Sequence, residues 1–118
     1  MHYESDYVLR LIEQMGGLVR RAIERLRIGS EAETYELADE AITLALDMEP
    51  QLLHRLSPQS LVSLLELNNL DDRVIQLVGE ALLLQAGALE QAGELVEASV
   101  RREQSRAVLA MLDPARAN

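Results

Sequence analysis

Apolar residues recur at intervals of three and four along most of the chain, which is the spacing that lines one face of an α-helix. The longest run has its apolar positions at Tyr7, Val8, Leu11, Ile12, Met15, Leu18, Val19, Ala22, Ile23 and Leu26. Ser5 or Asp6 can cap the start of this helix, and Gly29 can end it in the left-handed conformation. We therefore predict one long amphipathic helix over residues 7–26.

Two adjacent glycines, Gly16 and Gly17, lie in the middle of this predicted helix. Each glycine costs roughly 1 kcal/mol of helix stability relative to alanine. We expect either the close approach of another backbone at this point or a kink.

A second helix is predicted from the capping-box sequence Ser30 to Glu33, in which the serine oxygen accepts from the backbone amide of Glu33 while the Glu33 side chain reaches back. This helix is expected to run to about Met48. Pro50 stops it, because the proline ring disfavours helical backbone in the residue before it.

Further turn signals divide the rest of the chain. Residues 51–56 can form one short turn, and Ser57 followed by Pro58 is a cap that opens a short helix over 58–67. The turn at 68–71 carries its own cap and opens the next helix. We place a break at Gly87 and a last helix from about residue 88 to Leu112, with a single continuous helix over 72–103 as the alternative.

Length and composition favour one domain. The chain has 118 residues, of which 48% are hydrophobic, and this is enough to bury a single core. The predicted fold class is all-α, with five to six helices that form antiparallel helical hairpins. We assign residues 1–113 to the domain and residues 114–118 to a frayed C-terminal tail.

The predicted second helix resembles the second helix of a tetratricopeptide repeat. The repeat's aromatic, alanine, large apolar, alanine-leucine and proline positions are held by Tyr35, Ala38, Ile42, Ala45, Leu46 and Pro50. Gly87, Ala92 and Val96 match the same repeat pattern more weakly. Ala38 and Ala92 lie 54 residues apart, whereas a tandem array repeats at about 34. The resemblance implies a tetratricopeptide-like fold that is not a regular tandem array.

Residues 3–26, "YESDYVLRLIEQMGGLVRRAIERL", are also similar to the opening of a family of small bacterial proteins classed as a domain of unknown function. This resemblance implies a helical, repeat-like fold over the whole chain. It implies no catalytic residues.

Two hairpins leave an apolar face to be covered, because stacked helical repeats need about three units and caps for stability. The long first helix can cover this face within its own chain, or a second copy can pack against it. Homodimers are the commonest soluble oligomers, so we expect a homodimer.

Charge and composition narrow the function. The net charge of −9 and the low content of aromatic residues, three tyrosines only, argue against a nucleic-acid partner. The absence of cysteine removes disulfides, thiolate zinc sites and cysteine nucleophiles. The acidic N-terminus and the lack of a long apolar run lead us to expect a cytoplasmic protein without membrane attachment.

No sequence motif in this chain indicates catalysis. The only histidines are His2 and His54, and neither lies in a recognisable metal, phosphate-loop or nucleophile motif. We therefore assign no catalytic, metal-binding or cofactor-binding residues and no cofactor.

Opposite charges flank the predicted turn at residues 29 and 30. Arg20, Arg21, Arg25 and Arg27 are at the end of the first helix, and Glu31, Glu33, Glu36, Asp39 and Glu40 are in the first half of the second. The acids suit the positive end of a helix dipole, and we expect them to form a solvated face. The arginines either pair with these acids or receive an acidic partner peptide.

A set of small residues, Gly79, Gly87, Gly93, Ala81, Ala86, Ala88 and Ala92, surrounds the predicted last two helices. Small side chains allow helix axes to approach, so we expect close packing there, with a peptide-accepting groove as the alternative.

The sequence thus favours a small protein-interaction module without catalytic activity. It would bind a partner protein or peptide through a helical groove or through the arginines of the first helix. The alternative is a small-molecule binder or an enzyme built around His54 and neighbouring carboxylates.

Overall fold

The computed structural model describes residues 2–113, with side chains from residue 6 onward, and the described part of the chain forms six helices and no strand. The helices are α1 (His2–Arg27), α2 (Glu31–Leu46), α3 (Pro50–His54), α4 (Pro58–Leu67), α5 (Asp72–Gln91) and α6 (Leu95–Ala110). The all-α prediction is confirmed, and the helix predicted over 58–67 has those bounds.

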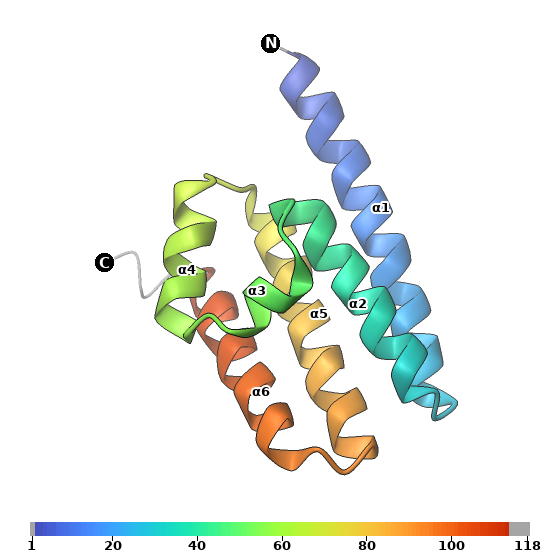
Figure 1. The fold of residues 1–118 in the computed structure, drawn as a ribbon. Helices are drawn as coiled ribbons and strands as arrows, with labels where there is room; N and C mark the ends of the chain where they lie inside the picture. The colour runs from blue at the N-terminus through green and yellow to red at the C-terminus, as the bar shows by residue number, and fades with distance from the viewer. Residues whose placement is uncertain (1, 114–118) are drawn as a thin grey trace.

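Two antiparallel hairpins dominate the arrangement, one made by α1 and α2 and the other by α5 and α6 (Figure 1). The hairpins meet where α2 packs against α5, and α1 packs against both of these helices. On the far side of the second hairpin, α4 packs against α6. The long first helix is therefore part of the first hairpin and packs against α5 of the second.

The core follows the apolar stripes of the sequence. Its buried members are Leu11, Met15, Val19, Ala38, Ala41, Ile42, Leu46, Leu53, Leu61, Leu65, Val74, Ile75, Val78, Ala81, Leu82 and Val108. Every helix contributes at least one of these side chains. Removal of this apolar surface from water is the main force that holds the hairpins together.

Glycine ends the first helix of each hairpin. Gly29 and Gly93 have φ angles of 84° and 83°, in the left-handed region that side chains with a Cβ disfavour. After α1, the amides of Gly29 and Ser30 donate to the carbonyls of Leu26 and Arg25. This pair of bonds is the Schellman motif, and it recurs after α5.

The predicted break at Gly87 is wrong, as is the continuous helix over 72–103. Gly87 lies inside α5, where a Cβ would come within 3.1 Å of a methyl carbon of Leu26. Its role is close packing against α1, while Gly93 supplies the turn. We predicted the turn at Gly87 alone from the sequence, because the contact of Gly87 with Leu26 depends on the packing of α5 against α1.

Close packing is tightest at Gly79, as expected from the small residues there. A Cβ at Gly79 would lie 2.6 Å from the Cγ of Leu109, so the Leu109 side chain could not keep its present position. The carbonyl of Gly79 accepts a hydrogen bond of 2.8 Å from Ser105. Close packing at Gly79 and the hydrogen bond from Ser105 therefore hold the middles of α5 and α6 together.

Two predictions at helix starts are wrong, as is one of the two alternatives for the glycines within α1. The first helix begins at His2, so residues 5 and 6 lie inside it and do not cap it. Ser30 precedes α2, but its hydroxyl donates to the Glu33 carboxylate at 2.6 Å and caps no amide. At Gly16, a Cβ would have only the Arg20 side chain within 4 Å, so no second backbone approaches.

The later caps are confirmed. The side chains of Ser57 and Asp71 accept from the amides of Ser60 and Arg73, at 3.1 and 2.8 Å. The second helix ends at Leu46 and not at Met48, because Asp47 takes a left-handed conformation with φ of 52°. Pro50 then occupies the start of α3, a position where a missing amide is tolerated.

The tetratricopeptide-like arrangement stays a prediction, although Ala38, Ile42 and Leu46 of that pattern are buried in α2. The predicted tail at residues 114–118 lies outside the described residues. Within the described residues, no helix combines the length and the apolar character needed to cross a membrane.

Substitution of Gly79 by alanine tests the close approach of α5 and α6. The new methyl group displaces Leu109, and we expect a loss of about 1–2 kcal/mol in the free energy of unfolding, despite the better helix propensity of alanine. The matched control is Gly17→Ala, where the nearest atom is an arginine nitrogen 3.9 Å away. We expect the control to gain up to about 1 kcal/mol in urea unfolding. Equal stabilisation by both substitutions would contradict this packing.

Candidate functional site

Four predicted site residues, Arg20, Arg21, Arg25 and Arg27, lie exposed on the last two turns of α1; we call them the arginine face. Arg27 donates to both carboxylate oxygens of Glu24, at 3.0 and 2.8 Å. The Nε of Arg25 lies 3.7 Å from a carboxylate oxygen of Glu33 on α2. The pairing expected across the turn thus involves Arg25 alone of the four.

Arg20 and Arg21 differ from the other two arginines. Neither forms an ion pair with a carboxylate among the described residues. Together with Gly17, Glu24 and Arg25 they line a shallow hollow of about 480 Å³. Gly17 has no side chain to fill this space, and the two arginines therefore flank an open, positively charged surface.

We predicted that all five acids of α2 form a solvated face, but one of them does not. Glu33, Glu36 and Glu40 are exposed, but Asp39 is largely buried. One Asp39 oxygen accepts from His54 on α3 at 3.1 Å and from the side-chain amide of Gln85 on α5. Asp39 is therefore part of the interior, because helix α2 presents this side chain to α3 and α5.

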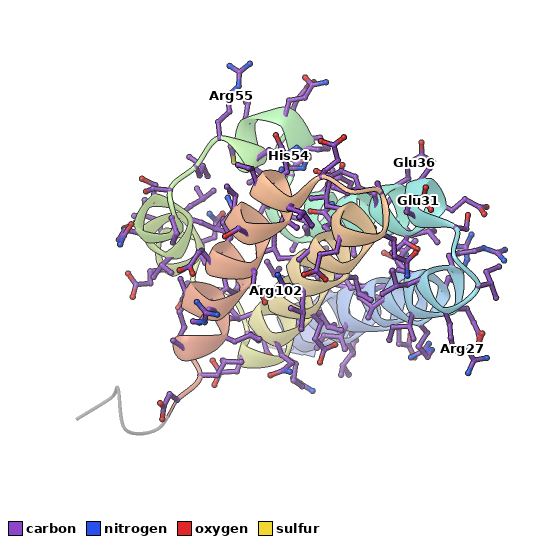
Figure 2. All side chains as sticks on the ribbon, turned by 90° about the horizontal axis from the view of Figure 1, so that it is seen from below. Arg27, Glu31, Glu36, His54, Arg55 and Arg102 are labelled. Carbon is purple, nitrogen blue, oxygen red and sulfur yellow. The ribbon has the colours of Figure 1, made fainter. Side chains whose placement is uncertain are left out.

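Asp39 belongs to a polar cluster that joins four helices. Its members are Tyr35 and Asp39 of α2, His54 of α3, Gln85 of α5, and Arg101 and Gln104 of α6. Figure 2 labels His54 on α3, beside the first turns of α6. The cluster lies where the two hairpins and the α3 turn meet.

One histidine tautomer satisfies the contacts around Tyr35. Arg101 Nη2 donates to the Tyr35 hydroxyl at 3.1 Å, and that hydroxyl lies 3.4 Å from His54 Nδ1 and 3.3 Å from Nε2. With the proton on Nε2, the hydroxyl can donate to Nδ1. His54 Nε2 then donates to Asp39. The rings of Tyr35 and His54 also meet edge to face, with centroids 5.6 Å apart. A chain of donors thus runs from the Arg101 guanidinium to the Asp39 carboxylate.

Arg101 is the most unusual member, because its charged side chain is 2% exposed. Its Nη1 donates to the side-chain oxygen of Gln104 at 3.2 Å. The nearest carboxylate is that of Glu97, 4.0 Å away and 62% exposed. Its Nε has no hydrogen-bond partner. Burial of a guanidinium with a distant counter-ion costs free energy of folding. The neighbouring groups that compensate for this cost therefore indicate what the residue does.

Gln104 links this arginine to the backbone of the α3 region. Its amide nitrogen donates to the carbonyls of Leu53 and Leu56, at 3.4 and 2.9 Å. Gln85 makes a similar bond to the carbonyl of Tyr35 at 3.3 Å. Gln104 thus bonds carbonyls at and just after the end of the short helix α3, whereas Gln85 bonds a carbonyl inside α2.

The electrostatics of Tyr35 bear on possible chemistry. Burial raises the pKa of the Tyr35 hydroxyl above its ordinary value, and this effect outweighs the hydrogen bond and the charge of Arg101, which lower it. The hydroxyl is therefore protonated at neutral pH, where it cannot act as a base. No serine or threonine of the described chain is hydrogen-bonded to His54, so the cluster lacks the nucleophile of a hydrolytic triad.

His54 was singled out from the sequence as a possible site, but Arg101, Gln85 and Gln104 were not. A sequence signal for Arg101 was present, because it follows buried Ala98 by three positions and precedes buried Val108 by seven. That spacing places Arg101 on the buried face of α6. A charged residue at an apolar position of the helical period was the sign to look for.

The described residues contain no group of three or more histidine, aspartate or glutamate side chains arranged to hold a metal ion. His54 and Asp39 form a pair, and Tyr35 and Gln85 occupy the space around them. His54 and Asp39 therefore link α3 to α2 by a hydrogen bond.

Replacement of Tyr35 by phenylalanine tests whether the cluster stabilises the fold. The change removes the acceptor of a buried charged donor, so we expect a loss of about 1–3 kcal/mol in the free energy of unfolding. The control is Tyr7→Phe, at a position that is 63% exposed, and its effect should stay within about 0.5 kcal/mol. Urea unfolding measures both, and equal small effects would contradict a stabilising role for the Tyr35 hydroxyl.

Comparisons with protein-family models, with curated proteins and with solved structures gave no significant match to this chain.

Proposed function

We propose that this chain is a cytoplasmic protein-interaction module without catalytic activity, and that its arginine face receives an acidic segment of a partner protein. The single observation that carries the proposal is that Arg20 and Arg21 are exposed beside an open hollow and form no ion pair among the described residues.

Charge supports an acidic partner. The whole chain carries a net charge of −9, so a cluster of cations stands out against an acidic background. Such a patch orients an approaching anionic segment and accelerates its association. Arginine also suits carboxylates, since its planar guanidinium can donate two parallel hydrogen bonds to one carboxylate.

The neighbouring surface favours a protein over a small ion. Ile23 and Ile28, in and just after the last turns of α1, are 49% and 66% exposed. A peptide with acidic and apolar side chains could use the cations and these apolar groups together. This combination is the reason to propose a polypeptide partner.

Binding of a capped oligoglutamate peptide tests the charge requirement. We expect weak binding at low salt that is lost as salt is raised, because exposed ion pairs are screened. The double variant Arg20→Gln with Arg21→Gln should weaken the affinity by about fivefold per arginine, or about 1 kcal/mol each. Fluorescence anisotropy of a labelled peptide measures the change.

The matched control is Arg73→Gln with Arg106→Gln, because these exposed arginines pair with Asp71 and Glu103. The control should retain the affinity of the parent chain. If the two double variants lose affinity equally, or if the peptide does not bind the parent, the arginine face is not the partner site.

A homodimer remains part of the proposal, supported by the length of α1. Its first turns extend beyond the ends of α2 and α5 (Figure 1), and Tyr7 and Leu9 there are 63% and 49% exposed. A second copy that packs against these turns would remove the two side chains from water.

Light scattering coupled to size exclusion tests the dimer. We expect twice the chain mass of 13.2 kDa over a concentration series. The double variant Tyr7→Glu with Leu9→Glu should shift the mass to that of one chain. Leu67→Glu is the control, at a position 84% exposed on α4, and it should leave the mass unchanged. A parent chain that is monomeric throughout would exclude the dimer.

A further inference from the structure

A second hollow, of about 380 Å³, lies between α3 and α6 and shares no residue with the arginine face. Two arginines, Arg55 and Arg101, line it together with His54 and one acid, Glu97. Figure 2 shows the labelled Arg55 and Arg27 at opposite margins of the molecule. In a chain of net charge −9, two guanidinium groups at one concave surface attract an anion.

Arg101 at this hollow is held in place but is incompletely paired. Tyr35 and Gln104 fix its two terminal nitrogens, so the guanidinium has little freedom to turn. Its Nε is buried and has no partner. A preorganised, unsatisfied cation is the kind of group that binding sites for anions provide.

Glu97 occupies the rim of the hollow as a weak counter-ion. It lies one helical turn before Arg101, and its carboxylate is 4.0 Å from Nη2, beyond ordinary hydrogen-bond distance. The Glu97 side chain is 62% exposed and can swing into water at little cost. A ligand carboxylate could therefore approach Arg101 more closely than Glu97 does.

The surroundings select the charge and shape of the ligand. Asp39 within the polar cluster and Glu97 at the rim repel a dianion more strongly than a monoanion. Val96 and Val100 form an apolar side of the hollow, and they are 81% and 42% exposed. The volume of the hollow is at the lower end of the range of small-molecule sites.

We propose that this hollow binds a single carboxylate that bears an aliphatic group, with Arg101 and Arg55 as its cationic partners and with Val96 and Val100 in contact with the aliphatic part. Either a small aliphatic acid or the C-terminus of a peptide presents this chemistry. The proposal does not rest on the arginine face, because the two sites have separate residues.

Titration of the ¹⁵N-labelled protein with N-acetylvaline tests the proposal. We expect saturable shifts in the Arg101 Nε–H resonance and in the amides of Val96 and Val100. N-acetylvalinamide, which has the same aliphatic group without the charge, should cause no such shifts. Saturable shifts by the amide, or no shifts by the acid, would overturn the proposal. Tighter binding of inorganic phosphate would overturn the assignment to a monocarboxylate.

A peptide that ends in valine distinguishes the two sources of the carboxylate. If the peptide binds more tightly than N-acetylvaline, and a C-terminally amidated copy does not bind, the ligand is a peptide C-terminus. If N-acetylvaline binds as tightly as the peptide, the ligand is a small acid. Both results support a carboxylate site at Arg101.

Variants at exposed positions keep the test independent of folding. Glu97→Gln removes the competing acid and should tighten the binding of N-acetylvaline by about fivefold, whereas Arg55→Gln should weaken it by about fivefold. Glu103→Gln and Arg106→Gln are the controls, since these residues form an exposed pair on the same helix. Equal effects in variants and controls would overturn the site, even if Arg101→Gln fails to fold.

Discussion

A charge inside the helical core is the constraint on which the junction of the two hairpins depends. The guanidinium of Arg101 is withdrawn from water, and a bare charge in such surroundings would destabilise the fold by several kcal/mol. Tyr35 and Gln104 replace the lost water molecules with hydrogen bonds. Because these two residues come from α2 and α6, the solvation of one side chain fixes the relation between the hairpins.

The same polar cluster positions α3, which has little apolar surface of its own to bury. Leu53 is its one buried residue, and α3 has few neighbours apart from α2. Gln104 binds the carbonyls of Leu53 and Leu56, and His54 binds Asp39. Hydrogen bonds are directional, whereas apolar contacts are not, so the cluster determines where this short helix lies. The hollow between α3 and α6 is a consequence of that placement.

The two basic surfaces of the molecule have different physical character. The four arginines of the arginine face are exposed, so their attraction for the proposed acidic partner would be screened by salt and would act mainly on association. Arg101 is buried, so its field is screened much less and its position is held by neighbours. A fixed, desolvated cation discriminates among small anions by geometry, whereas a flexible exposed patch accepts many acidic segments.

Periodic apolar spacing determined by itself that the chain is all-α, because a three-and-four repeat buries one face only in a helix. Caps at Ser57 and Asp71 were also readable, since they depend on neighbouring residues alone. Tertiary structure decided which glycine turns the chain: both Gly87 and Gly93 permit a turn, but Gly87 is needed against Leu26. It also decided the partners of Arg101. Its burial was implicit in the helical period, whereas Tyr35 lies 66 residues away in sequence, and only packing of α2 against the second hairpin brings its hydroxyl within reach.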